Sequence, residues 1–168
     1  MTAKSVIAAA AALVLMLSPT AAGAQELVLG ANLGGASGVE GGDPGSGAMA
    51  FRRARSRIVG QLEMRVDDDK KNGMSAVIFA EVEPHASVGG SLRYLRFLSA
   101  TTYLFAGVTG VGAPHTLLGG ELGAQFHIGD AIGLFVEPSF AALPLGTDLP
   151  QDHVLVWGLL TLGIHANL

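Results

Sequence analysis

A two-residue alternation in the second half of the chain most constrains its fold. Between residues 119 and 128 the even positions are Gly, Leu, Ala, Phe and Ile, whereas the odd positions include Glu121 and His127. The same rule holds from residue 132 to 140, where apolar even positions alternate with odd positions that include Glu137. Because successive side chains of a strand point to opposite faces, each segment has one apolar face and one face that carries ionisable groups.

Residues 1–24 are predicted to be a signal peptide and are excluded from the fold. Lys4 supplies the positive charge, Val6 to Leu17 form the apolar core, and Ala22-Gly23-Ala24 fits a small-x-small cleavage site. An uncleaved anchor is the alternative, but the apolar stretch is shorter than the roughly 20 residues of a spanning helix. The chain has no cysteine, so an exported protein of this sequence must be stabilised by burial or by barrel closure rather than by disulfides.

Composition separates the chain from ordinary soluble domains. Charged residues make up 14% of it, well below the roughly 25% of an average soluble domain, and apolar residues make up 49%. The net charge is −4 and there is no basic tail, so nucleic acid is not an expected partner. A high apolar content in alternating segments is typical of a barrel with an apolar exterior.

The alternation recurs along the chain and predicts about eight strands, most of them near the roughly 9–11 residues needed to cross a bilayer at a tilt. The predicted strands span residues 25–35, 51–67, 74–83, 88–96, 101–111, 119–128, 132–140 and 153–167. We therefore expect residues 25–168 to form an all-β domain, a closed antiparallel up-and-down transmembrane β-barrel with apolar residues outside and charged residues inside.

The connections between these segments also alternate. Segments 36–48 and 143–152 are rich in Gly and Pro and are predicted to be long loops, whereas 67–73 and 129–130 are predicted to be short turns. A competing interpretation concerns residues 97–120, which lack Lys, Arg, Asp and Glu and so resemble a spanning helix. Several glycines, Pro114 and many β-branched or aromatic residues in that segment favour a strand.

In such a barrel, five arginines and five glutamates are expected on the inner wall. They are Arg53, Arg55, Arg57, Arg65, Arg93, Glu63, Glu81, Glu83, Glu121 and Glu137. An arginine facing lipid near the midplane would cost roughly 2–4 kcal/mol, whereas opposite charges on neighbouring strands compensate each other. The sequence therefore predicts an ion-pair network that fills a small lumen. A narrow wet passage or a lumenal binding site is the alternative.

No motif predicts catalysis or cofactor binding. The five histidines lack metal-site spacing, and His127, beside Gln125 on an inner face, is expected to be a satisfied interior residue. No glycine-rich phosphate motif precedes a helix. We therefore expect no catalytic residue, no cofactor and no metal, and a protein that is not an enzyme. Trp157 and Tyr94 are expected to anchor the barrel at the membrane interface.

The last strand carries apolar residues at every second position, namely Leu160, Leu162, Ile164, Ala166 and Leu168. Over residues 25–168 the chain resembles the small bacterial outer-membrane barrels of the OmpA/OmpX type. The resemblance implies the outer membrane of a Gram-negative bacterium, contact with outer-membrane lipid, a monomeric state, and insertion by the barrel-assembly machinery, which in that family reads this final pattern.

A small outer-membrane lipid A deacylase is also similar in size and architecture. That enzyme family carries a His followed two positions later by Ser. Here His127 is followed by Ile128 and Gly129, so the motif is absent and the activity is not carried over.

The expected role is non-enzymatic: a structural role in the cell envelope, surface interaction through the outer loops, or minor porin-like solute passage. The main alternative is a soluble secreted or periplasmic β-barrel that binds a small apolar ligand. The two interpretations predict opposite interiors, because a soluble barrel would expose Arg55, Arg57, Glu81 and Glu121, whereas a membrane barrel would enclose them.

Overall fold

The computed structural model describes residues 28–42, 51–65, 71–83, 86–113, 116–146 and 154–168, without the side chains of residues 51–53 and 113. The predicted signal peptide lies outside these ranges. The strands are β1 (Val28–Gly42), β2 (Phe51–Arg65), β3 (Asn72–Glu83), β4 (Ser87–Phe97), β5 (Thr102–Ala113), β6 (Leu117–Gly129), β7 (Ile132–Gly146) and β8 (Leu155–Asn167).

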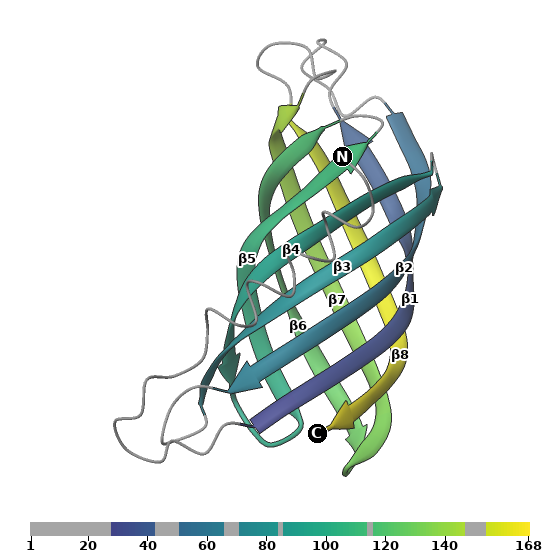
Figure 1. Ribbon diagram of the computed structural model, residues 1–168. Coiled ribbons are helices and arrows are strands. Elements are labelled where there is room, and N and C mark those ends of the chain that lie inside the picture. The colour runs from purple at the N-terminus through teal and green to yellow at the C-terminus, as the bar shows by residue number, and fades with distance from the viewer. Residues whose placement is uncertain (1–27, 43–50, 66–70, 84–85, 114–115, 147–153) are drawn as a thin grey trace.

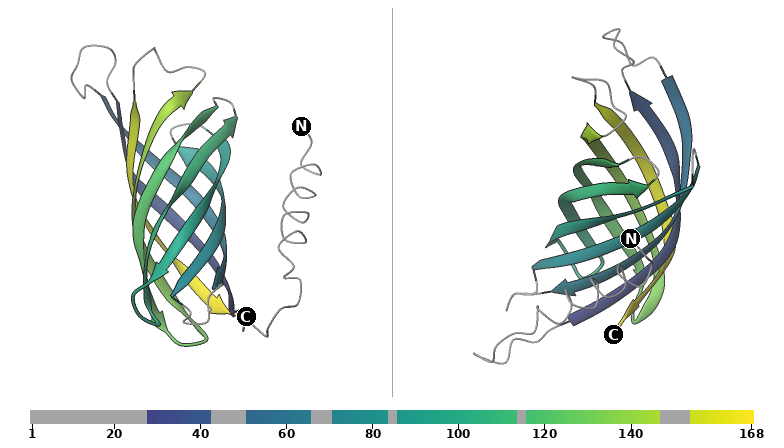
Figure 2. Two further views of the ribbon diagram at one scale, coloured as in Figure 1. Left: turned by 90° about the vertical axis from the view of Figure 1, so that its left-hand side faces the viewer. Right: turned by 45° about the horizontal axis from the view of Figure 1, so that its top comes forward.

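The eight strands form one closed barrel in which each strand pairs with its sequence neighbours (Figure 1). All pairs are antiparallel, and β1 closes the sheet against β8 through pairs that run from Gly30 with Asn167 to Gly42 with Leu155. The strands wrap obliquely around one axis (Figure 2). The predicted all-β closed barrel with eight strands is therefore confirmed.

The helical interpretation of residues 97–120 is wrong, because the described part of this segment belongs to β4, β5 and β6 and the turn between β4 and β5. Among the described residues, no helix is long and apolar enough to cross a membrane. The short turn predicted at residues 129–130 is present, and Gly129 adopts a φ of 113° that L-residues with a side chain rarely adopt.

Two predicted loops begin later than the sequence indicates. The ladder between β1 and β2 continues through Glu40 paired with Arg53 and Gly42 paired with Phe51. Similarly, β7 extends to Gly146 and not only to residue 140. Gly-rich and Pro-containing segments were expected to form loops, but pairing on both sides in a closed sheet keeps them extended.

The apolar faces of the strands point outward. Large apolar side chains are exposed on every strand, including Leu33, Ile58, Ile78, Leu92, Val108, Leu122, Leu134 and Leu162. The charged faces point inward, where Arg55, Glu81 and Glu121 are at most 6% exposed. The predicted polarity, apolar outside and charged inside, is confirmed.

Interior aromatic rings lie against glycines of neighbouring strands. Phe79 is opposite Gly89 and Phe105 is opposite Gly123. A Cβ atom added to either glycine would lie within 3.0 Å of the facing ring. These glycines make room for the inward aromatic rings of the neighbouring strands.

Candidate functional site in the lumen

The polar residues of the lumen form three clusters along the barrel axis. The Arg55 cluster lies nearest the end where β1 connects to β2, and contains Glu40, Arg55, Arg57, Glu81 and Trp157. The Arg93 cluster follows, with Arg93, Glu121 and Glu137. The Glu63 cluster lies nearest the end where β2 connects to β3, and contains Asn32, Gln61, Glu63, Tyr103 and Gln125.

In the Arg55 cluster, two guanidinium groups share two carboxylates and one indole ring. Arg55 pairs with both Glu40 and Glu81, and Arg57 Nη2 lies 2.9 Å from Glu81 Oε1. The guanidinium carbons of Arg55 and Arg57 lie 4.3 and 4.4 Å from the Trp157 ring centroid. Cation–π contacts of this kind are strongest where water is excluded. Because the partners come from β1, β2, β3 and β8, their charge-assisted contacts join these four strands.

The prediction that Trp157 anchors the barrel at a membrane interface is wrong. Trp157 is 2% exposed and lies inside, whereas Tyr94 is 52% exposed on the outer wall. The physical reason is strand parity: Leu155, Trp157 and Leu159 share the inward face of β8, and the indole finds its polar neighbours there.

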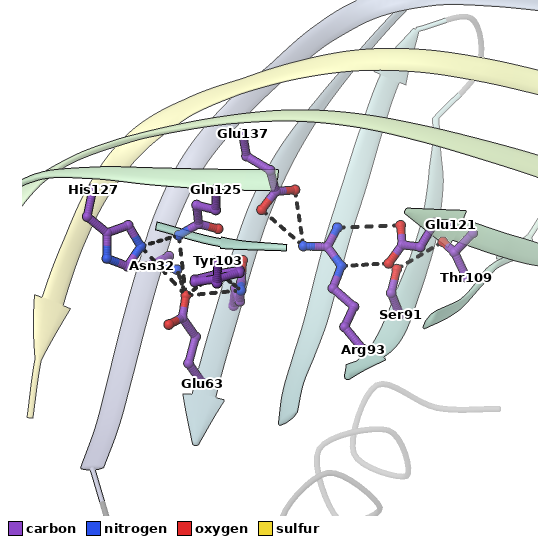
Figure 3. A network of polar contacts seen from close by, with 11 residues as sticks. Asn32, Glu63, Ser91, Arg93, Tyr103, Thr109, Glu121, Gln125, His127 and Glu137 are labelled. Carbon is purple, nitrogen blue, oxygen red and sulfur yellow. Dashed lines mark hydrogen bonds and ion pairs between the residues drawn. The ribbon is translucent and has the colours of Figure 1, made fainter. Parts of the chain in front are cut away.

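The Arg93 cluster is a doubly paired arginine (Figure 3). Arg93 Nε donates to Glu121 Oε1 at 2.6 Å, and Nη1 donates to both oxygens of Glu137 at 3.0 Å. The guanidinium carbon lies 4.1 Å from the Phe105 ring centroid. A planar guanidinium suits this arrangement, because its donors diverge in one plane while its face covers the ring.

In the Glu63 cluster, one carboxylate oxygen accepts hydrogen bonds from several neutral side chains (Figure 3). Glu63 Oε1 accepts hydrogen bonds from Asn32 Nδ2, from Gln61 Nε2 at 3.1 Å, from Tyr103 Oη at 2.6 Å and from Gln125 Nε2 at 3.3 Å. The donors come from β1, β2, β5 and β6. This convergence of neutral donors compensates the buried carboxylate and cross-links β1, β2, β5 and β6.

Two histidines border this cluster. The ring of His127 stacks on that of His165 with centroids 4.3 Å apart and planes 14° apart, and His127 Nε2 lies 4.0 Å from Glu63 Oε1. His127 also contacts the Gln125 side-chain amide. Among the described residues, no group of three His, Cys, Asp or Glu side chains is arranged to hold a metal ion.

The predicted site residues fall into distinct groups. Those buried in the lumen are Arg55, Arg57, Arg93, Glu63, Glu81, Glu121 and Glu137. Arg65 is half-buried, with its guanidinium carbon 4.1 Å from the Phe97 ring centroid. Arg53 belongs to β2, but its side chain lies outside the described atoms.

Glu83 departs from the expectation, because its side chain is exposed rather than lumenal. It ends β3 and accepts a hydrogen bond from Ser56 Oγ at 3.4 Å. The register between β2 and β3 shifts between Ser56 and Arg57, so the inward parity of β3 is lost beyond Glu81.

Sequence reasoning missed several lumen residues. The Gly-rich composition around Glu40 predicts a loop, and no sequence motif marks Asn32, Gln61, Tyr103 or His165 as lumen partners. Each of them lies on the inward face of its strand, so parity alone would have identified them once the strands were drawn at full length. With Glu40 included, the buried side chains hold three arginines and five glutamates, so the expected balance of five against five does not hold among the described side chains.

The lumen between the Arg55 and Arg93 clusters contains a cavity of only about 10 Å³. This volume is about that of one water molecule, so it leaves no room for a solute. Chemically, the polar side chains of the described lumen cross-link strands of the barrel.

Comparisons with known proteins give little further information. No protein-family model matches the chain, and no curated protein sequence matches it. Among solved structures, the chain is similar to the crystal structure of Neisserial surface protein A (NspA), with 13% sequence identity and a TM-score of 0.42. The match covers 86% of this chain and 99% of that chain.

Proposed function

We propose that this chain is a small outer-membrane β-barrel protein with a closed lumen and a structural or surface-interaction role. The observation that carries the proposal is the reversed polarity of the barrel. Its outer wall presents large apolar side chains from every strand, while Arg55, Arg93 and Glu137 are buried at its axis. Soluble monomers rarely expose contiguous apolar patches beyond a few hundred Å², so a lipid environment suits this exterior.

The height of the apolar wall supports a bilayer. On β6 the outward positions run from Leu118 to Ile128 and are apolar throughout. These ten residue steps, at about 3.4 Å each and a tilt of about 40°, rise about 25 Å along the barrel axis, which is about the height of the apolar band of outer-membrane barrels.

The lumen favours a structural role over solute passage. The buried arginines pair with glutamates of other strands, and the cavity between the Arg55 and Arg93 clusters has a volume of only about 10 Å³. We further propose that the protein is not an enzyme and needs no cofactor.

The final strand supports the proposed route of assembly. Leu160, Leu162 and Ile164 of β8 point outward and are exposed, as in the OmpA/OmpX-type barrels that the sequence resembles. We infer export by the signal peptide at residues 1–24, insertion by the barrel-assembly machinery, lipid as the main contact, and a monomer without nucleic-acid partners.

Cell fractionation tests the location. We expect the protein in the outer-membrane fraction, with a folded band in unheated detergent gels that shifts after boiling. Recovery as a soluble periplasmic protein would contradict the proposal and favour the alternative barrel that binds an apolar ligand.

A pair of arginine substitutions tests the environment of the outer wall directly. Leu122 lies near the middle of the outward face of β6 and Ile128 lies near its end, and both are exposed. In a membrane, Leu122→Arg should lower the free energy of unfolding in lipid vesicles by roughly 2–4 kcal/mol and Ile128→Arg by roughly 0–1. Equal, small effects of the two substitutions would indicate that the outer wall faces water.

A further inference from the structure

Polar and apolar residues line the cavity between the Arg55 and Arg93 clusters. The polar ones are Arg57, Arg93, Glu121, Glu137, Ser139 and Thr161, and the apolar ones are Val59, Val77, Phe79 and Leu159. Its volume of about 10 Å³ is close to the minimum that a single water molecule needs.

Arg57 lines this cavity and carries unpaired donors. Its Nε has no hydrogen-bond acceptor among the described residues, and Nη2, although near Glu81, is not aligned for a hydrogen bond. The faces of its guanidinium are covered, since the guanidinium carbon lies 4.1 Å from the Phe79 centroid and 4.4 Å from the Trp157 centroid. The edge of the group therefore needs an acceptor, because unpaired buried donors cost roughly 1–3 kcal/mol each.

The charges around the cavity select the chemical class of that acceptor. Two arginines and two glutamates line it, so their formal charges cancel and neither a cation nor an anion is required. A water molecule can accept from a guanidinium and donate to a carboxylate at the same time.

We propose that this cavity binds one ordered water molecule, which accepts a hydrogen bond from Arg57 and donates to the carboxylate of Glu121 or Glu137. The water joins the Arg55 and Arg93 clusters into one continuous polar network inside the barrel. This inference goes beyond the proposed function and does not depend on the location of the protein in a membrane.

Oxygen-17 relaxation dispersion, which counts long-lived internal water molecules, tests the proposal on the folded protein in detergent. Ser139 lines the cavity, so Ser139→Val should fill it and remove one long-lived water relative to the wild type. Ser91 is also a buried lumenal serine, its hydroxyl is paired with Thr109, and it does not line the cavity, so Ser91→Val serves as the matched control and should leave the count unchanged.

A second variant covers the case in which Ser139→Val does not fold. Thr161→Val keeps the shape of the lining and removes one polar group, so it should shorten the residence time of the same water. Equal water counts and residence times in all variants would overturn the proposal. A crystal soaked in bromide or rubidium that gives an anomalous peak in the cavity would also overturn it, because the occupant would then be an ion.

Discussion

Arg93 shows what one side chain contributes to the closed lumen. Its guanidinium binds two carboxylates from β6 and β7 and covers an aromatic ring from β5. Arg57 and Arg55 repeat this scheme with Trp157. For Arg93 and Arg55 the guanidinium pairs with two carboxylates and its face covers an aromatic ring, so one residue provides both electrostatic pairing and packing.

Replacing Arg93 should therefore lower the stability of the barrel. Arg93→Met leaves Glu121 and Glu137 buried without their cation, and we expect the free energy of unfolding in urea to fall by about 3–5 kcal/mol. Arg96→Met is the control, because Arg96 lies on the same strand but is exposed, and it should change stability by less than about 1 kcal/mol. Similar losses in the two variants would contradict the assigned role of the Arg93 cluster.

Restoring the charge balance should recover part of the free energy of unfolding that Arg93→Met loses. Adding Glu121→Gln and Glu137→Gln to Arg93→Met replaces two uncompensated carboxylates by neutral amides of similar shape. We expect a higher free energy of unfolding for the triple variant than for Arg93→Met alone. Replacing a whole buried ion pair by neutral groups costs less than removing only its cation.

Individual residues also show how far sequence reasoning extends. Alternation placed Glu121, Glu137 and Arg93 correctly, because a strand that separates two environments fixes the side of every residue by its parity. It failed for Glu83, where a register shift ends the parity, and for Trp157, where a general preference of tryptophan was given more weight than position in the strand.

At the scale of the strand, inward glycines act together with inward aromatic rings. Phe105 lies across from Gly123, and a Cβ on Gly123 would lie within 3.0 Å of the ring. Phe135 lies in the same way across from Gly163. Glycine is therefore needed at these positions for space, although it normally weakens a strand.

A pair of substitutions on one strand tests this arrangement. Gly123→Ala should crowd both the Pro138 carbonyl and the Phe105 ring and lower the free energy of unfolding by about 1–3 kcal/mol. Gly120→Ala, on the outward face of β6, should have little effect, because the nearest atom to a Cβ there is 3.8 Å away. Urea unfolding measures the change in the free energy of unfolding for each variant. Equal changes for Gly123→Ala and Gly120→Ala would show that backbone freedom, rather than space, matters at Gly123.

Strand boundaries were the least predictable element. Residues 36–42 contain several glycines and resemble a loop, yet they pair with both β2 and β8. Local composition cannot reveal such pairing, because the partners are distant in sequence. This is why Glu40, the partner of Arg55, was missed although its side of the strand follows from parity.

At the scale of the whole molecule, a closed barrel with a filled lumen should not conduct. The cavity between the Arg55 and Arg93 clusters has a volume of about 10 Å³, too small for a hydrated ion. We expect the wild-type protein in planar lipid bilayers to give no steady current above that of the bare membrane. Reproducible unitary currents from the purified wild type would instead favour the solute-passage role.

The position of Trp157, the single tryptophan of the chain, has a practical consequence. Its ring is buried inside the barrel against the guanidinium groups of Arg55 and Arg57. Its fluorescence should therefore be insensitive to brominated acyl chains, which quench only tryptophans that they touch. The same signal should change when the barrel opens, so the chain carries an intrinsic optical reporter of its own closure.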